Sequence, residues 1–113
     1  MNSSIFFVFL AVFSVSVAQT LTISPVGDVT VVEGTVLDIT CTHTDGTTSG
    51  FGIILHQNGA QLVGGDTPPN EVTGATRVFH VSVDRAKNGS TYNCESALNP
   101  GQSPVITLTV TCE

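Results

Sequence analysis

Two cysteines, Cys41 and Cys94, stand in a chain that otherwise consists of short runs of alternating apolar and polar residues. Tyr92 lies two positions before the second cysteine. Both cysteines fall at inward-facing positions of their runs, so they can meet in the core from two different sheets. These features predict a two-sheet sandwich pinned by one disulfide, which by chain entropy stabilises the fold by about 4 kcal/mol.

The first 18 residues have the pattern of a secretory signal. A nearly unbroken apolar run from Ile5 to Val15 precedes the small residues Ser16-Val17-Ala18. This run is shorter than the roughly 20 residues that a membrane-spanning helix needs, which favours a removable signal over an anchor. We therefore expect a signal peptide at 1–18, one domain at 19–113, and a protein that is secreted or displayed on the extracellular face of the cell.

The charge of the chain excludes several classes of partner. The net charge is −6 at pH 7, with nine Asp and Glu residues against three Lys and Arg residues. Phosphate backbones and anionic membrane surfaces are bound by concentrated positive charge, and this sequence has no basic cluster. We expect no binding to nucleic acid and no membrane insertion within this chain.

Apolar residues recur at every second position of the mature region, as in half-buried strands, and no long segment has a helical stripe. Asn58-Gly59 predicts a tight hairpin turn. Segments rich in Gly, Pro, Asn, Asp or Thr predict loops at 44–50, 64–74 and 99–103. The inward rows that we expect are Val29 and Val31; Leu37, Ile39 and Cys41; Phe51, Ile53 and Leu55; Phe79, Val81 and Val83; Tyr92 and Cys94; and Ile106, Leu108 and Val110.

Two segments around the cysteines carry a family resemblance. One is Val31-Val32-Glu33-Gly34 followed by Leu37-Asp38-Ile39-Thr40-Cys41; the other is Asn88-Gly89-Ser90-Thr91-Tyr92-Asn93-Cys94. They resemble strands A′, B and F of the immunoglobulin superfamily, with Asn88 at the usual acidic position and Ser90 at the usual glycine. The interval between the cysteines is similar to that of intermediate-set and C2-like domains. The resemblance implies an all-β, two-sheet antiparallel immunoglobulin-like sandwich with one inter-sheet disulfide.

Two residues have structural roles that the resemblance implies. Leu55 stands where this family usually packs a tryptophan on the disulfide; leucine keeps the position apolar but buries less area. Tyr92 would form a tyrosine corner, with its hydroxyl bonded to backbone near the loop before strand F.

Two positions invite covalent modification. Asn88-Gly89-Ser90 is an acceptor sequon for an N-linked glycan, although Asn-Gly can also serve only as a turn. Cys112 is left without a partner inside the chain once the other two cysteines are joined. A covalent dimer, a bond to a downstream region and an inert thiol are the three open alternatives.

We predict no catalytic, cofactor or metal site, and no enzyme. His80, Ser82 and Asp84 share one strand face, but neighbours on such a face lie about 6.6 Å apart, too far for a bond between nucleophile and base. We expect His43 in a loop, whereas His56 and His80 point outward from opposite sheets. No Cys or His spacing matches a zinc module.

Three surfaces are candidates for partner binding. The first is the outward Ile54 with His56, Asn93 and Glu95 around it, although one exposed apolar side chain is common on any protein. The second is the loop 98–102, which includes Asn99, Pro100 and Gln102, and the third is the loop 44–50.

We expect an extracellular recognition, adhesion or immune-type module that binds a protein ligand or a second copy noncovalently. One form of this expectation is that the module is the N-terminal domain of a longer receptor. The alternative is a free secreted factor that works as a dimer linked through Cys112.

Overall fold

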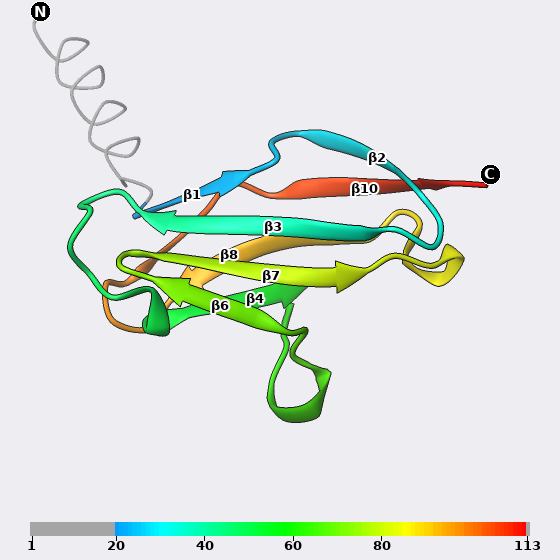
Figure 1. Cartoon of the computed structure of the whole chain (residues 1–113). Helices are drawn as coiled ribbons and strands as arrows, with labels where there is room; N and C mark the ends of the chain where they lie inside the picture. The colour runs from blue at the N-terminus through cyan, green and yellow to red at the C-terminus, as the bar shows by residue number, and fades with distance from the viewer. Residues whose placement is uncertain (1–19, 113) are drawn as a thin grey trace, which may run out of the picture.

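The alternation in the sequence becomes strands in the computed structural model, which describes residues 20–112. The predicted signal peptide at 1–18 lies outside these residues. Two sheets pack face to face (Figure 1). The first has the order β1-β3-β7-β6, with β1 at Leu21–Ser24, β3 at Val36–His43, β7 at Thr76–Ser82 and β6 at Asn70–Thr73.

The second sheet has the order β2-β10-β8-β4-β5, and β9 pairs with β8. Its strands are β2 at Asp28–Val32, β10 at Ile106–Thr111, β8 at Thr91–Ser96, β4 at Ile53–Gln57, β5 at Ala60–Gln61 and β9 at Gly101–Gln102. The short 3-10 helices are η1 at Gly50–Gly52, η2 at Gly64–Asp66 and η3 at Arg85–Lys87. Strand pairs are antiparallel as predicted, except that β2 runs parallel to β10.

The predicted disulfide is confirmed, and it joins the two sheets. Cys41 on β3 and Cys94 on β8 are bonded, with their Cα atoms 6.5 Å apart. Both side chains are fully buried, and most of the predicted inward rows surround them. The buried apolar core consists of Leu21, Ile23, Leu37, Ile39, Cys41, Ile53, Leu55, Phe79, Val81, Val83, Tyr92, Cys94, Ile106 and Leu108.

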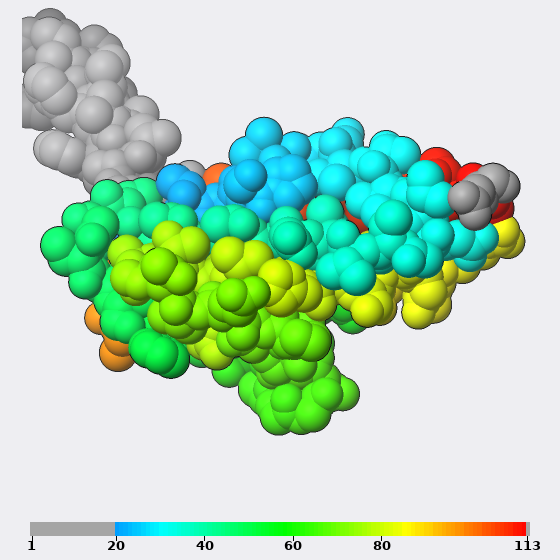
Figure 2. Space-filling model, viewed as in Figure 1, coloured from blue at the N-terminus to red at the C-terminus, as the bar shows by residue number. Residues whose placement is uncertain are grey.

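The predicted hairpin at Asn58-Gly59 is also confirmed. The turn joins β4 to β5, with His56 opposite Gln61 and Gln57 opposite Ala60. Both turn residues have positive φ, 54° and 81°, which is the backbone that a two-residue turn of type I′ requires. Beyond β5 the chain forms the segment that projects from the sandwich in Figure 2.

The observed secondary structure differs from the expected one at four points, one of which is β9 at Gly101–Gln102, inside the predicted loop 99–103. Phe51 does not continue the row of Ile53 and Leu55: it lies in η1, before β4 begins, and is 74% exposed. β6 occupies part of the predicted loop 64–74, because its backbone pairs with β7 even though the segment before it is rich in Gly and Pro. β1 was not predicted, although its Leu21 and Ile23 alternate and are buried.

Candidate recognition surface

One face of the second sheet gathers the predicted binding residues of β4, β8 and β9. Since Ile53 and Leu55 point into the core, Ile54 and His56 project from the opposite side of β4. The strand register places Ile54 beside Glu95, His56 beside Asn93, and Glu95 beside Gln102. The face is therefore a continuous row across three strands, with Ile54 only partly covered.

The polar members of this face bond to one another. His56 Nε2 lies 2.9 Å from Glu95 Oε1, and Asn93 Nδ2 donates to Gln102 Oε1 at 3.2 Å. The His56 side chain is 14% exposed and that of Glu95 is 39% exposed. A partner would thus meet a fixed array in which the Glu95 carboxylate and Ile54 remain accessible.

The connection between β8 and β9 adjoins this face and is anchored at Asn99. The Asn99 N–H donates to Ser96 Oγ at 2.9 Å, and its carbonyl accepts from Thr20 Oγ1 at 3.2 Å. Its neighbours in the connection, Leu98 and Pro100, are exposed. The loop therefore presents side chains from a fixed backbone.

His43 does not lie in a loop, as we expected, but ends β3 with only 1% of its surface exposed. It continues the inward row of Leu37, Ile39 and Cys41, a period-two signal that the sequence already contained. Its Nε2 lies 2.7 Å from Ser96 Oγ on the opposite sheet, and its Nδ1 has no hydrogen-bond partner within residues 20–112. This buried polar pair ties the two sheets together beneath the loops 44–49 and 97–100.

The tyrosine corner takes a different form from the expected one. The Tyr92 hydroxyl donates to the side-chain Oε1 of Gln57 at 2.8 Å, not to backbone near the loop before β8. Gln57 is the direct register partner of Tyr92, so its amide is within reach of the hydroxyl. Burial raises the pKa of Tyr92 above its usual value, which keeps the hydroxyl a donor. Leu55, opposite Cys94 in the register, is buried at the tryptophan position.

The two candidate modification sites lie at the other end of the sandwich. Asn88 is exposed, and its Oδ1 accepts from the Val110 N–H at 2.9 Å, whereas Ser90 of the sequon is 7% exposed. Cys112 follows β10 with its thiol exposed and in contact with the Arg85 guanidinium. Glycosylation and dimer formation stay predictions.

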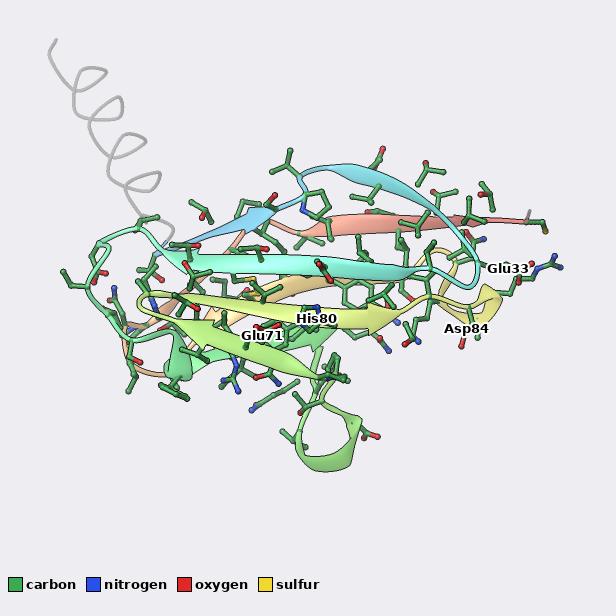
Figure 3. All side chains as sticks on the ribbon, in the orientation of Figure 1. Glu33, Glu71, His80 and Asp84 are labelled. Carbon is green, nitrogen blue, oxygen red and sulfur yellow. A yellow bond between two sulfur atoms is a disulfide. The ribbon has the colours of Figure 1, made fainter. Side chains whose placement is uncertain are left out.

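His80 is held by carboxylates from neighbouring strands, not by Ser82 or Asp84. Its Nδ1 lies 2.7 Å from Asp38 Oδ1 on β3, and its Nε2 lies 2.8 Å from Glu71 Oε2 on β6. Figure 3 labels His80 and Glu71 on their neighbouring strands. Hydrogen bonds to these carboxylates, first Asp38 and then Glu71, raise the pKa of His80 above its usual value. The arrangement is a cross-strand clip on the first sheet, and it lacks the contact between base and hydroxyl that nucleophilic catalysis needs.

Two further observations concern residues 20–112 as a whole. No three or more His, Cys, Asp or Glu side chains gather there in a way that could hold a metal ion. No helix in this part of the chain is long and apolar enough to cross a membrane.

With the fold and these contacts established, the family can be assigned. The family model described as Immunoglobulin domain matches residues 27–107. The chain belongs to the immunoglobulin domain family. Among solved structures, the crystal structure of domain I10 from titin matches with a TM-score of 0.59 and 18% identity, over 82% of this chain and 100% of that one. No match was found among curated proteins. At this identity the titin domain supports the immunoglobulin fold alone.

Proposed function

We propose that this immunoglobulin domain is an extracellular adhesion or immune-type recognition module, on its own or as the N-terminal domain of a longer receptor. It binds a protein partner noncovalently through the outer face of β4, β8 and β9. The observation that carries the proposal is the row of Ile54, Glu95 and Gln102 across three strands, where an accessible apolar side chain lies beside a fixed carboxylate. Protein–protein interfaces combine apolar contact with a polar rim in this way.

The extracellular setting rests on two features. A disulfide in a protein core persists in oxidising compartments, and the bond between Cys41 and Cys94 spans this core. The predicted signal peptide at 1–18 supplies the route to such a compartment. Both features agree with secretion or display at the cell surface.

A macromolecular partner fits the surface better than a small ligand does. Two hollows, of about 260 and 190 Å³, lie beside the projecting segment after β5, and Leu62 and Thr67 line both. Small-molecule sites usually enclose about 300–1,000 Å³. Neither hollow reaches that size, whereas an open sheet face suits a protein surface.

The proposal can be tested with a fluorescent tetramer of the domain applied to an array of purified extracellular domains, including this chain itself. We expect capture by at least one of them, and at least tenfold weaker binding for Ile54→Asp. Val36→Asp is the matched control, because Val36 is an exposed apolar residue on the other sheet. An Ile54→Asp tetramer that binds as well as wild type would show that this face is not the contact.

A second candidate is a free secreted factor linked as a dimer through Cys112. The thiol beyond β10, which contacts the Arg85 guanidinium, favours it, because an exposed sulfur can reach the same residue of a second chain. We expect a band of twice the monomer mass in non-reducing electrophoresis of the secreted protein, and its loss in Cys112→Ser. A wild-type protein that migrates only as a monomer would rule this candidate out.

A further inference from the structure

Two large apolar side chains are exposed together at the end of the sandwich that carries the loops 44–49 and 97–100. Phe51 is 74% exposed and Leu98 is 60% exposed. They come from segments in direct contact, because the Ala97 N–H donates to the Gly52 carbonyl at 2.8 Å. The Leu98 side chain lies over Gly52, where an added Cβ would fall 2.5 Å from its Cγ. We call Phe51 and Leu98 the loop-end patch.

The backbone beneath this patch is fixed. The Phe51 N–H donates to Ser49 Oγ at 3.2 Å, and the Gly50 N–H donates to the Gly74 carbonyl at 2.8 Å. Gly50 also packs so closely on the Thr76 backbone that a Cβ would collide with it. Side chains on a fixed backbone lose less conformational entropy when they bind, which is typical of the residues that dominate binding energy.

One side of the loop-end patch carries the Asp45 carboxylate. Asp45 accepts from the Thr48 hydroxyl and from the N–H groups of Thr48 and Thr47, and these bonds lower its pKa to about 2. Asn99 Nδ2 lies 3.4 Å from Asp45 Oδ2, which joins the carboxylate to the loop of Leu98. No Lys or Arg within residues 20–112 forms an ion pair with Asp45.

The basic residues of the described chain form their contacts away from the Asp45 carboxylate. Arg85 and Lys87 belong to η3, at the opposite end of the sandwich in Figure 1. Arg77 lies nearer, on the Phe51 side of the patch, where its guanidinium donates to the neutral carbonyls of Phe51 and Ile53 and to Asn70 Oδ1 and so keeps its positive charge. A partner that places Lys or Arg on the Asp45 side of the patch would therefore meet a carboxylate that has no ion pair within residues 20–112.

We infer that the loop-end patch is the main anchor for a protein partner that presents an apolar pocket edged by Lys or Arg. The inference rests on the proposed function, because it requires a noncovalent protein partner. It adds the anchoring residues and the chemistry of that partner. The patch adjoins the sheet face through the connection between β8 and β9, so one partner can cover both.

The test uses the same tetramer and array with three forms of the chain. One is wild type, the second is the double variant Phe51→Ser with Leu98→Ser, and the third is Val26→Ser with Val105→Ser. The last is a matched control, because Val26 and Val105 are 72% and 56% exposed and belong to other segments, Val26 between β1 and β2 and Val105 just before β10. All four positions are exposed, so we expect each form to fold. We expect the first double variant to bind at least tenfold more weakly, and the control to bind like wild type.

The charge of Asp45 gives a second measurement. Asp45→Asn should weaken binding several-fold and reduce its dependence on salt, because a rim charge acts through long-range attraction. The captured domain should bind more weakly as salt is raised, since screening shortens the reach of charge.

The remaining outcomes separate the inference from the proposed function. If no extracellular domain captures wild type, both are wrong. If Ile54→Asp abolishes capture and the double variant Phe51→Ser with Leu98→Ser does not, the sheet face binds and the inference is wrong. Equal losses in the control with Val26 and Val105 also overturn the inference. So does capture by this chain alone, because the inferred partner has an apolar pocket edged by Lys or Arg, and the loop-end patch of a second copy carries the same Asp45 carboxylate.

Discussion

The carboxylates at the two ends of the sandwich differ in their partners: one end uses hydrogen-bond donors, and the other end uses ion pairs. At the end with the loop-end patch, Asp45 is stabilised by hydroxyl and backbone donors and has no ion pair within residues 20–112. At the opposite end, where Figure 3 labels Glu33 and Asp84, Arg85 Nη2 lies 3.4 Å from Glu33 Oε1 and Lys87 Nζ lies 3.9 Å from Asp84 Oδ2. Exposed pairs of this kind contribute little to stability. The two ion pairs cancel the negative field of Glu33 and Asp84 locally. The Asp45 carboxylate at the loop end has no ion pair within residues 20–112, so its field can act on a partner.

The ends also differ in what holds them together. Both ends have backbone bonds, but the loop end also contains the buried pair of His43 and Ser96, two side chains from opposite sheets. At the opposite end the side-chain bond of Asn88 to the Val110 N–H is exposed. Loss of a side-chain bond should therefore cost more stability at the loop end than at the opposite end.

The largest expected effect on stability comes from removing the disulfide, because this bond joins the two sheets and so supports both ends. Cys94→Ala should lower the free energy of unfolding by about 4 kcal/mol, because the unfolded chain regains the entropy that the bond removes. Urea denaturation followed by circular dichroism measures this. Cys112→Ser, at an exposed position, should leave the midpoint unchanged. Equal midpoints for Cys94→Ala and wild type would contradict the structural role of the bond.

A pair of variants tests the contrast between the ends directly. His43→Ala should cost about 2–3 kcal/mol, since it leaves a cavity and deprives buried Ser96 Oγ of a partner. Asn88→Ala at the opposite end removes one exposed bond to Val110 and should cost about 1 kcal/mol or less. Unglycosylated protein should be used for both. Faster amide exchange of Asn99 in His43→Ala would locate the effect, and equal costs for the two variants would refute the contrast.

The smallest effect concerns His80, which lies on the sheet between the ends. Its pKa is raised above 6.5 in the folded state by Asp38 and Glu71, so its contribution to stability is complete below about pH 6.5 and is lost as pH rises through the folded value. The advantage of wild type over His80→Gln in melting temperature should therefore be largest near pH 6. It should be small, because Asp38 and Glu71 are mostly exposed. A difference that stays constant from about pH 6 to about pH 9 would contradict the clip.

The sequence predicted the parts of the fold that depend on local pattern. Alternation and the cysteines were enough for the sandwich, the disulfide and the outward position of Ile54. Phe51 was wrongly assigned to the core, because alternation alone does not show at which residue a strand begins. The short helix η1, capped by Ser49, contains Phe51 and ends before β4 begins. The loop-end patch was hidden by that error.

Other features depend on register, which a single sequence does not specify. Asp38 and His80 are far apart in the chain, and they meet because β3 and β7 pair in one particular alignment. The same holds for His43 with Ser96 and for Tyr92 with Gln57, which bond across sheets or strands. Residue types alone gave no means to choose these partners.

The parallel pairing of β2 with β10 bears on the order in which the chain can fold. These two strands come from the beginning and the end of the described domain, so their contact closes nearly the whole chain. Loop closure of that length is entropically costly and slow unless earlier contacts shorten the path. The bond between Cys41 and Cys94 is such a shortcut. We therefore expect the edge of the second sheet to assemble last, after the centre has formed around the cysteines.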